Sequence, residues 1–557
     1  MEIRDHLEYP DISLYDMLFR SAEKFPDLTA IEYYSRKISY KELLGTVDRT
    51  ASALTSLGVK SGDIVSVILP NIPQAIAVFY ALNRIGAIAG MIHPLSAEGE
   101  INSCIELTES KLVIALDMIS DKLGGALKKG CKVILASPGD EMPFFMRAAY
   151  FALKGRKAVG EKMICWKKFI SRGAERKNYP EFQGSESAAI LYSGGTTGKP
   201  KGIVLTNLNF NALAIQSING CGCLKAGDRV LSVMPVFHGF GLGVCIHTVF
   251  TFGGTAVILP QFKAAEFHKL VLKYKPEVIA GVPAIYEYML RSRGFENKDL
   301  SFLKCIISGG DSLSISTKEK LDKVFAECGC KAKIREGYGL TECVTGTCLM
   351  PENSEKTGSI GLPYADTLYK IVDSSTGTEV PDGEIGEIVI SGAAVMKGYF
   401  KNDEETEKTL ERGKDGRIWL HTGDMGYKDS EGFIYFKQRL KRIIISNGYN
   451  IYPQNIENII DSHKDVICSA VVGIPDEIRG ERVKAFVVPA KEADTDKLRK
   501  ELEELCLRSI AAYSVPREYR FIAEMPRTLV GKIAYTKLKG GEYEKENTAD
   551  TSGDITD

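Results

Sequence analysis

Apolar runs alternate with helical patterns through the first two thirds of the chain. Residues 63–70 (DIVSVILP) form a continuous apolar run that ends at a proline, as a buried strand does. A helical pattern over 74–85 and a second apolar run over 87–93 follow. Further apolar runs of this kind occupy 228–235, 255–259, 278–281 and 305–308. This alternation predicts parallel sheets covered by helices.

The pattern changes after about residue 360. Short strand-like runs joined by Gly/Asp turns predict a β-rich part over about 360–439, and a small α+β domain is predicted over 440–540. The acidic tail 541–557 has no apolar periodicity and is expected to be disordered. The expected fold class is α/β: a large N-terminal domain, residues 1–439, with two parallel-sheet subdomains and the β-rich part, followed by the small C-terminal domain.

Composition narrows the function classes. The 557 residues carry 71 Lys and Arg against 72 Asp and Glu, a net charge of −1, which excludes the overall basic field of a typical nucleic-acid-binding protein. Thirteen cysteines lack zinc-binding spacing, so reduced thiols in a cytoplasmic protein are favoured over a metal site. No apolar stretch reaches the ~20 clean residues of a membrane span. The sequence leaves monomer and homodimer both open.

One basic segment stands apart, residues 142–180. It contains ten Lys or Arg and two Glu, a local charge of 10 − 2 = +8, and several aromatic side chains. A basic, aromatic segment can lie on a membrane surface. On a helical wheel, however, Arg147 and Lys154 share one side while Arg156 and Lys157 lie elsewhere, which indicates poor amphipathicity. A packed, partly exposed insertion is therefore favoured over a weak peripheral membrane contact.

The strongest local motif is the loop 192–202 (YSGGTTGKPKG), which follows an apolar run. Glycines let backbone N–H groups approach a phosphate closely, and hydroxyls and lysines add donors and positive charge. The loop is not a Walker P-loop, because the spacing from Gly194 to Gly198 is one residue short. In addition, Pro200 stands where a Ser or Thr would bind Mg²⁺. The loop predicts a phosphate-binding site of another kind.

This loop resembles the signature loop of the adenylate-forming superfamily, which includes acyl- and aryl-CoA ligases. Four further segments resemble that family's remaining motifs in order and spacing: 336–342 (EGYGLTE), 421–424 (HTGD), 438–457 (beginning QRLK) and 526–532 (PRTLVGK). The resemblance is closest to fatty acyl-CoA synthetases. It implies ATP-dependent activation of a medium- or long-chain fatty acid through an acyl-adenylate, then acyl transfer to CoA with release of AMP and pyrophosphate. ATP, Mg²⁺ and coenzyme A are the implied cofactors and co-substrates.

The resemblance also implies individual roles. Thr341 would hydrogen-bond the α-phosphate, and Glu342 would hold Mg²⁺ as a carboxylate ligand. Tyr338 would stack on adenine, Asp424 would accept the ribose hydroxyls, and Lys532 would bridge the substrate carboxylate and the α-phosphate. The expected ATP-binding set further comprises Ser193, Gly194, Gly195, Thr196, Thr197, Gly198, Lys199, Lys201, Gly309, Gly310, Asp311, Glu336, Gly337, Gly339 and Arg439.

The segment 234–243 (MPVFHGFGLG) resembles the acyl-tunnel segment of the family. Amino-acid-activating relatives place an Asp here, so a substrate ammonium would be buried without a partner in this chain, which disfavours amino acids. His238 is expected at the substrate carboxylate, as a catalytic residue with Thr341, Glu342 and Lys532. Gly339 stands where acetyl-activating relatives carry Trp, and it implies an open tunnel. The expected pocket comprises Phe237, His238, Gly239, Phe240, Gly241, Val282 and Gly339, its glycines freeing volume.

The resemblance finally implies a mobile C-terminal domain that rotates between the two half-reactions. Lys441 is the expected hinge, and Ser446, Asn447, Gly448 and Tyr449 are expected to face CoA. Two alternatives stay open: a ligase for aryl or other bulky carboxylates, and a loading enzyme that passes the acyl group to a carrier protein. A non-catalytic binding protein is disfavoured, because binding alone would not need the lysine of the last motif.

Overall fold

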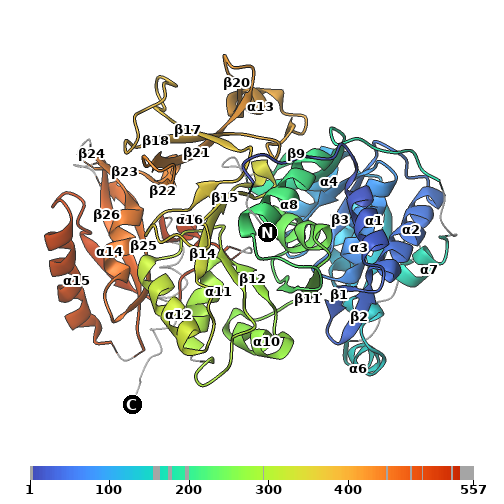
Figure 1. Cartoon of the computed structure of the whole chain (residues 1–557), viewed down its shortest axis with the longest axis horizontal. Coiled ribbons are helices and arrows are strands. Elements are labelled where there is room, and N and C mark those ends of the chain that lie inside the picture. Colours follow the sequence, from blue (N-terminus) through green and yellow to red (C-terminus); the bar gives the residue numbers. More distant parts are fainter. Residues whose placement is uncertain are drawn as a thin grey trace.

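The structure is a computed structural model that describes residues 4–154, 163–173, 178–194, 200–292, 294–446, 449–476, 480–491, 493–528 and 531–539. In Figure 1 the N-terminal elements (blue) lie on one side of the molecule and the C-terminal domain (orange to red) lies on the other, with the yellow-green elements between them. The acidic tail 541–557 and most of the glycine-rich loop, residues 195–199, lie outside the described residues.

The first sheet has eight strands in the order β19-β9-β8-β4-β3-β5-β6-β7. Pairing is parallel from β8 to β7, and it is antiparallel between β8, β9 and β19. The strands are β3 (Ile64–Ile68), β4 (Ile88–Met91), β5 (Leu112–Leu116), β6 (Lys132–Ala136), β7 (Met163–Cys165), β8 (Ser187–Gly194), β9 (Pro200–Thr206) and β19 (Gly398–Tyr399). The two predicted apolar runs thus form β3 and β4.

The second sheet has nine strands in the order β16-β15-β14-β13-β12-β10-β11-β1-β2. Its centre is parallel, and antiparallel strands close both edges. The strands are β1 (Thr29–Tyr33), β2 (Arg36–Ser39), β10 (Arg229–Leu231), β11 (Thr255–Ile258), β12 (Val278–Gly281), β13 (Cys305–Ser308), β14 (Ile334–Gly339), β15 (Gly346–Leu349) and β16 (Leu362–Pro363). The predicted α/β class is confirmed.

The helices of the N-terminal domain follow from capping and burial. The helix α2 begins at a capping box formed by Ser39 and Glu42, and α3 begins with a proline, whose missing N–H costs nothing there. Every residue of α3 up to Asn83 is buried, which explains its lack of a polar face. The longer helices are α1 (Leu14–Lys24), α2 (Tyr40–Ser56), α3 (Pro73–Arg84), α4 (Glu98–Thr108), α6 (Phe144–Lys154), α8 (Asn207–Cys221), α10 (Phe267–Tyr274), α11 (Pro283–Ser292) and α12 (Ile315–Glu327). The shorter ones are α5 (Gly124–Lys128), α7 (Trp166–Ile170), α9 (Val249–Thr251) and the π-helix η3 (Phe240–Thr248).

The β-rich part and the C-terminal domain each contain one five-stranded sheet. The β-rich sheet holds β17 (Leu368–Val372), β18 (Gly386–Ser391), β20 (Leu410–Arg412), β21 (Ile418–Lys428) and β22 (Ile434–Arg439), with α13 (Asp403–Thr409) beside it. The C-terminal sheet holds β23 (Ile444–Ser446), β24 (Tyr449–Ile451), β25 (Val466–Asp476), β26 (Gly480–Pro489) and β27 (Glu518–Phe521), with α14 (Pro453–Asp461), α15 (Thr495–Ser509) and α16 (Tyr535–Lys539). A single turn, η6 (Leu440–Arg442), joins the two sheets.

Buried apolar side chains form one large cluster across the N-terminal domain and a second one under β10 to β14. The C-terminal domain has two smaller clusters of its own, one on each face of its sheet, which include Val471 and Val472 as neighbours on β25. Within the described residues, no helix combines the length and the apolar character needed to cross a membrane.

Candidate active site

About half of the residues predicted to bind ATP line one polar pocket. The carboxyl ends of β13 and β14 meet there, as ligand sites in parallel sheets do. The β-rich sheet and the C-terminal domain supply the other walls. We call this the polar pocket; its wall includes Ser308, Gly310, Asp311, Glu336, Gly337, Tyr338, Gly339, Asp424, Arg439, Arg442, Lys532 and Tyr535. Gly309 precedes Gly310 in the same turn and lines the neighbouring apolar pocket described below.

Asp424 is fixed at the floor of the polar pocket by two partners. The Tyr338 hydroxyl donates to Asp424 Oδ2 at 2.6 Å, and Arg439 Nε lies 3.4 Å from Asp424 Oδ1. The antiparallel pairing of β21 with β22 places Asp424 directly opposite Arg439. Burial raises the pKa of the Asp424 carboxyl, and the guanidinium of Arg439 opposes that rise. The Asp424–Arg439 pair therefore provides a buried hydrogen-bond acceptor whose negative charge is balanced by the adjacent guanidinium.

Glu342 follows Thr341 in a single turn beyond β14. The Tyr399 hydroxyl donates to Glu342 Oε1 at 2.9 Å, which orients the carboxylate. No described residue donates to Oε2, so an oxygen ligand remains for a hard cation such as Mg²⁺. Tyr399 lies on β19, beside the strand β9 that follows the glycine-rich loop. Glu342 is therefore next to the point where that loop rejoins the sheet.

The glycine-rich loop is described only at its two ends. Ser193 and Gly194 end β8, and Lys201 lies opposite Ser193 on β9. Lys201 forms an ion pair with Glu405 of α13 and lies over the Tyr399 ring. The predicted phosphate ligands Gly195, Thr196, Thr197, Gly198 and Lys199 lie outside the described residues, and their role stays a prediction.

Lys532 enters the polar pocket from the C-terminal domain. The next residue along the chain, Ile533, donates its backbone N–H to Asp311 Oδ2 at 3.3 Å. Burial and the nearby Arg439 lower the pKa of Lys532, while surrounding carboxylates oppose that change. Burial and the charge of Lys532 lower the pKa of His238 to about 4, so its imidazole is neutral at pH 7. Two predicted catalytic residues from distant parts of the chain thus interact electrostatically.

Sequence reasoning did not find Arg442 as a pocket residue. Its guanidinium lies 3.5 Å from the centroid of the Tyr535 ring, and its Nη2 lies 2.7 Å from Glu457 Oε1. Tyr535 supports the guanidinium of Arg442, so a cation lines that wall of the polar pocket. The sequence did offer one signal for this pocket residue, namely an arginine directly after the predicted hinge.

An apolar pocket adjoins the polar pocket and shares Gly310, Gly337, Tyr338 and Gly339 with it. Of the residues predicted to form the acyl pocket, only Phe240 and Gly339 line it. The rest of its wall comes from α8, η3, α9, the strands β10, β12, β13 and β15 and adjoining loops: Ser217, Cys221, Leu224, Val230, Val244, Thr248, Val249, Phe252, Val278, Ala280, Ile307, Thr345, Cys348, Leu349 and Tyr364. The spacing of 244, 248 and 252, four residues apart on one helical face, was a signal that the sequence offered.

The remaining predicted pocket residues lie elsewhere around the site. The Phe237 ring packs 4.1 Å from that of His93, centroid to centroid. Val282 lies beside Gly310 and Gly531, at the contact with the loop that carries Lys532. The expectation that the glycines free volume is wrong. A Cβ at Gly239 would collide with the Val344 carbonyl, one at Gly241 with Pro235, and one at Gly339 with Thr345. These glycines let backbone segments touch.

The loop bearing Lys532 is held against the N-terminal domain by a buried ion pair. Arg527 Nη2 lies 2.6 Å from Glu287 Oε2 of α11, and the two side chains are only 17% and 11% exposed. Arg527 Nη1 also donates to the Gly531 carbonyl at 3.0 Å. One guanidinium therefore fixes both the loop's shape and its position.

The predicted hinge, Lys441, lies within η6 between β22 and β23. Ser446 ends β23 and is buried, and Tyr449 begins β24. Asn447 and Gly448 lie outside the described residues. These four predicted CoA contacts are thus on the C-terminal side of the turn, and Ser446 does not line the polar pocket.

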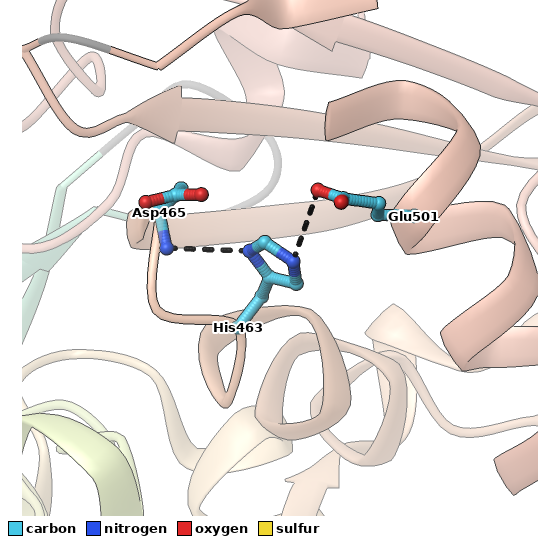
Figure 2. A group of neighbouring side chains, drawn as sticks. All are labelled: His463, Asp465 and Glu501. Atoms are coloured by element: carbon cyan, nitrogen blue, oxygen red, sulfur yellow. Dashed lines mark hydrogen bonds and ion pairs between the residues drawn. The ribbon is translucent and has the colours of Figure 1, made fainter. Parts of the chain in front are cut away.

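A separate group of metal-type ligands lies in the C-terminal domain, away from both pockets. Figure 2 shows His463 between Asp465 and Glu501. The backbone N–H of Asp465 donates to His463 Nδ1 at 3.2 Å, and His463 Nε2 lies 3.5 Å from Glu501 Oε2. Both ring nitrogens are therefore engaged within the protein, which identifies a structural contact between α14 and α15.

Comparisons with known proteins agree with the motifs. Residues 18–400 match the AMP-binding enzyme family, and residues 455–532 match the AMP-binding enzyme C-terminal domain. The chain is 35% identical to a long-chain-fatty-acid–CoA ligase of Bacillus subtilis, covering 98% of this chain and 97% of that one. It is 31% identical to 4-coumarate–CoA ligase-like 2 of Arabidopsis thaliana, covering 90% and 86%. ATP-bound MatB from Rhodopseudomonas palustris has a TM-score of 0.81 at 26% identity, covering 96% and 99%.

The first family match alone spans well over half of the chain, and the second lies in the domain that supplies Lys532. The ATP-bound neighbour shares the whole fold, with both domains aligned. The predicted family is therefore confirmed: the chain belongs to the AMP-binding enzyme family of adenylate-forming enzymes.

Proposed function

We propose that this protein is an ATP-dependent acyl-CoA ligase for medium- or long-chain fatty acids. The observation that carries the proposal is the apolar pocket that adjoins the polar pocket at Gly310 and Tyr338. An acid whose carboxylate reaches Lys532 would place its chain in that pocket. The fatty-acid ligase relative, aligned over nearly the full length of both chains, supports the same substrate class.

Two displacements make up the proposed reaction. A carboxylate oxygen attacks the α-phosphorus of ATP, pyrophosphate leaves, and an acyl-adenylate remains. The sulfur of CoA then attacks the acyl carbonyl carbon, the thiol proton is lost, and AMP leaves. The first step brings two anions together, so the site must neutralise charge that accumulates around the phosphorus.

Residues in and around the polar pocket would share the work of that first step. The ammonium of Lys532 would contact both the substrate carboxylate and the α-phosphate. Thr341 donates its hydroxyl to the α-phosphate, and Asp424, held by Tyr338, accepts the ribose hydroxyls. Neutral His238 donates an N–H to the carboxylate without adding a second cation. Mg²⁺, when held by Glu342, would neutralise part of the charge on the phosphates.

A release assay tests the proposal directly. Pyrophosphate release would be measured over acids from C2 to C18, 4-coumarate and benzoate, with and without CoA. We expect the highest kcat/KM for an acid of C8 or longer and a CoA-dependent turnover. Turnover with CoA on 4-coumarate or benzoate alone would instead support an aryl-CoA ligase, which the plant relative keeps as the second candidate. Adenylation that CoA never discharges would indicate a carrier-protein loading enzyme.

The apolar pocket gives a prediction about chain length. Val244 lines it on η3 and is half-buried, so a larger side chain there has room to enter the pocket. We expect Val244→Phe to lower kcat/KM for the preferred long acid by about 10- to 100-fold, because a lost methylene contact costs ~1–3 kcal/mol. Adenylation of a short acid should persist, which controls for folding. An unchanged chain-length profile would exclude Val244 from the acyl site.

The buried ion pair at the docked loop gives a second prediction. We expect Glu287→Gln to slow adenylation by roughly tenfold or more, because it leaves the Arg527 cation buried without its counter-charge. Thioester formation from supplied acyl-adenylate should change much less. The matched control is Tyr288→Phe, which removes the more exposed contact with Glu524 at the same interface. Equal losses in both half-reactions would contradict a role limited to the adenylation arrangement.

A further inference from the structure

The helix α6 is held at the edge of the molecule by one side only. In Figure 1 it lies at the periphery, beyond β2, and none of its described residues lines either pocket. Its inner face carries Tyr150 and Phe151, which pack so closely on Gly139 that no Cβ would fit there. The turn that contains Gly139, Pro138–Glu141, is tied to the first strands of the chain by two contacts: Tyr33 donates to the Pro138 carbonyl, and Arg36 forms an ion pair with Glu141.

The outer face of α6 is apolar. The side chains of Phe144, Phe145 and Leu153 are 78%, 84% and 86% exposed, and Met146 and three alanines lie on the same side. Between residues 144 and 153 the only charged side chain is that of Arg147, which is half-buried on the inner side. The prediction of poor amphipathicity rested partly on Arg156 and Lys157, which lie outside the described residues; α6 itself turns an apolar face outward. Surface helices of water-soluble proteins normally turn that face inward.

Exposed basic side chains lie on the next helix of the segment 142–180. Lys167 and Lys168 on α7 and Arg172 after it are exposed. Trp166, the first residue of α7, lines one surface hollow together with Arg36 and with Glu141 of the turn that holds α6. An anionic surface would attract these exposed cations, whereas two copies of the chain would repel each other through them.

We propose that α6 is a membrane-docking helix that inserts Phe144, Phe145 and Leu153 into the surface of a bilayer containing anionic lipids. Exposed aromatic and aliphatic side chains on one face, with exposed basic residues on the next helix of the segment, match the physical requirements of an interfacial helix. The surface is separate from the candidate active site. If the proposed function holds, docking would bring the enzyme to the bilayer in which a long-chain acid dissolves.

Vesicle co-sedimentation of the full-length chain tests this proposal without any substrate. We expect binding to vesicles of phosphatidylglycerol and phosphatidylcholine, little binding to phosphatidylcholine alone, and roughly a fivefold or greater loss of binding at about 0.5 M salt. The double variant Phe145→Gln/Leu153→Gln should bind roughly tenfold more weakly or worse. The matched control is Leu507→Gln, which removes an equally isolated exposed leucine, 60% exposed, from α15.

Adenylation of a water-soluble short acid should be unchanged in every variant, which separates loss of docking from loss of folding. Replacing Lys167 and Lys168 with Gln should reduce the preference for anionic vesicles and leave the apolar contribution. Absence of binding by the unmodified chain would overturn the proposal, and so would equal binding by the Phe145→Gln/Leu153→Gln variant. A self-association that this variant abolishes, without vesicle binding, would assign the face to a second copy of the chain instead.

Discussion

Lys532→Ala should reduce acyl-adenylate formation by roughly 10²–10³-fold, the loss expected for one preorganised donor at developing charge. Its half-buried side chain lines the polar pocket, where the carboxylates of Asp311, Asp424 and Glu342 oppose the lowering of its pKa. The reaction of supplied acyl-adenylate with CoA should be affected much less, because that step does not build charge on the phosphorus. Pyrophosphate release measures the rate of adenylation, and thioester formation measures the rate of the second half-reaction.

Two variants make this test specific. Lys537→Ala removes an exposed lysine from α16 in the same domain and should leave both half-reactions unchanged. Lys532→Arg keeps the charge but changes its geometry, and it should recover only part of the loss. A Lys532→Ala enzyme that loses both half-reactions equally would indicate a structural role for this side chain and would remove it from the catalytic set.

Lys441→Pro should separate the two half-reactions in the opposite sense. The residue lies in the first turn of η6, where a proline is compatible with the backbone, so the arrangement with Lys532 in the pocket should survive. Rotation of the C-terminal domain needs a large φ/ψ change at the hinge, and proline fixes φ near about −65°. We expect adenylation to be kept within a few-fold, CoA-dependent turnover to fall by about 10²-fold, and acyl-adenylate to accumulate on the enzyme.

Lys441→Ala is the control, because it removes the side chain and keeps the backbone free to rotate. It should support both half-reactions. If Lys441→Pro also supports both, the rotation either occurs at another residue or is not required. Trapping of acyl-adenylate, measured by quenching the enzyme and recovering the nucleotide, distinguishes a blocked second step from a general loss of activity.

The parts of the site whose residues lie within short motifs could be predicted from the sequence. Asp424 and Arg439 meet because β21 and β22 pair, and the segments that contain them are recognisable as motifs from their residues alone. The meeting of Tyr338 with Asp424 is less local, yet both belong to such motifs. Type and order of residues were sufficient here, since each motif keeps its chemistry within a few positions.

The apolar pocket could not be predicted in the same way, because its wall is a tertiary product. Ser217 of α8 and Ile307 of β13 line one cavity although they are far apart in the chain, and neither belongs to a motif. The prediction that Gly339 opens the tunnel failed for a related reason. A glycine can stand where there is open space or where another backbone segment passes too close for a Cβ. Only the position of Thr345 decides between these two.

The stack of Arg442 on Tyr535 has a consequence for how the site would empty. Arg442 is the last residue of the turn Leu440–Arg442, and Tyr535 and Lys532 lie after this turn in the chain. Arg439 and Asp424 lie before the turn. A rotation at this turn would withdraw two of the three cations that line the described wall and leave the third beside its own carboxylate. The wall would change from three cations facing the carboxyl groups of Asp311, Glu336 and Asp424 to one cation facing the same three, so the pocket would become acidic. Pyrophosphate would lose most of its attraction at that moment, while the acyl-adenylate kept its apolar contacts.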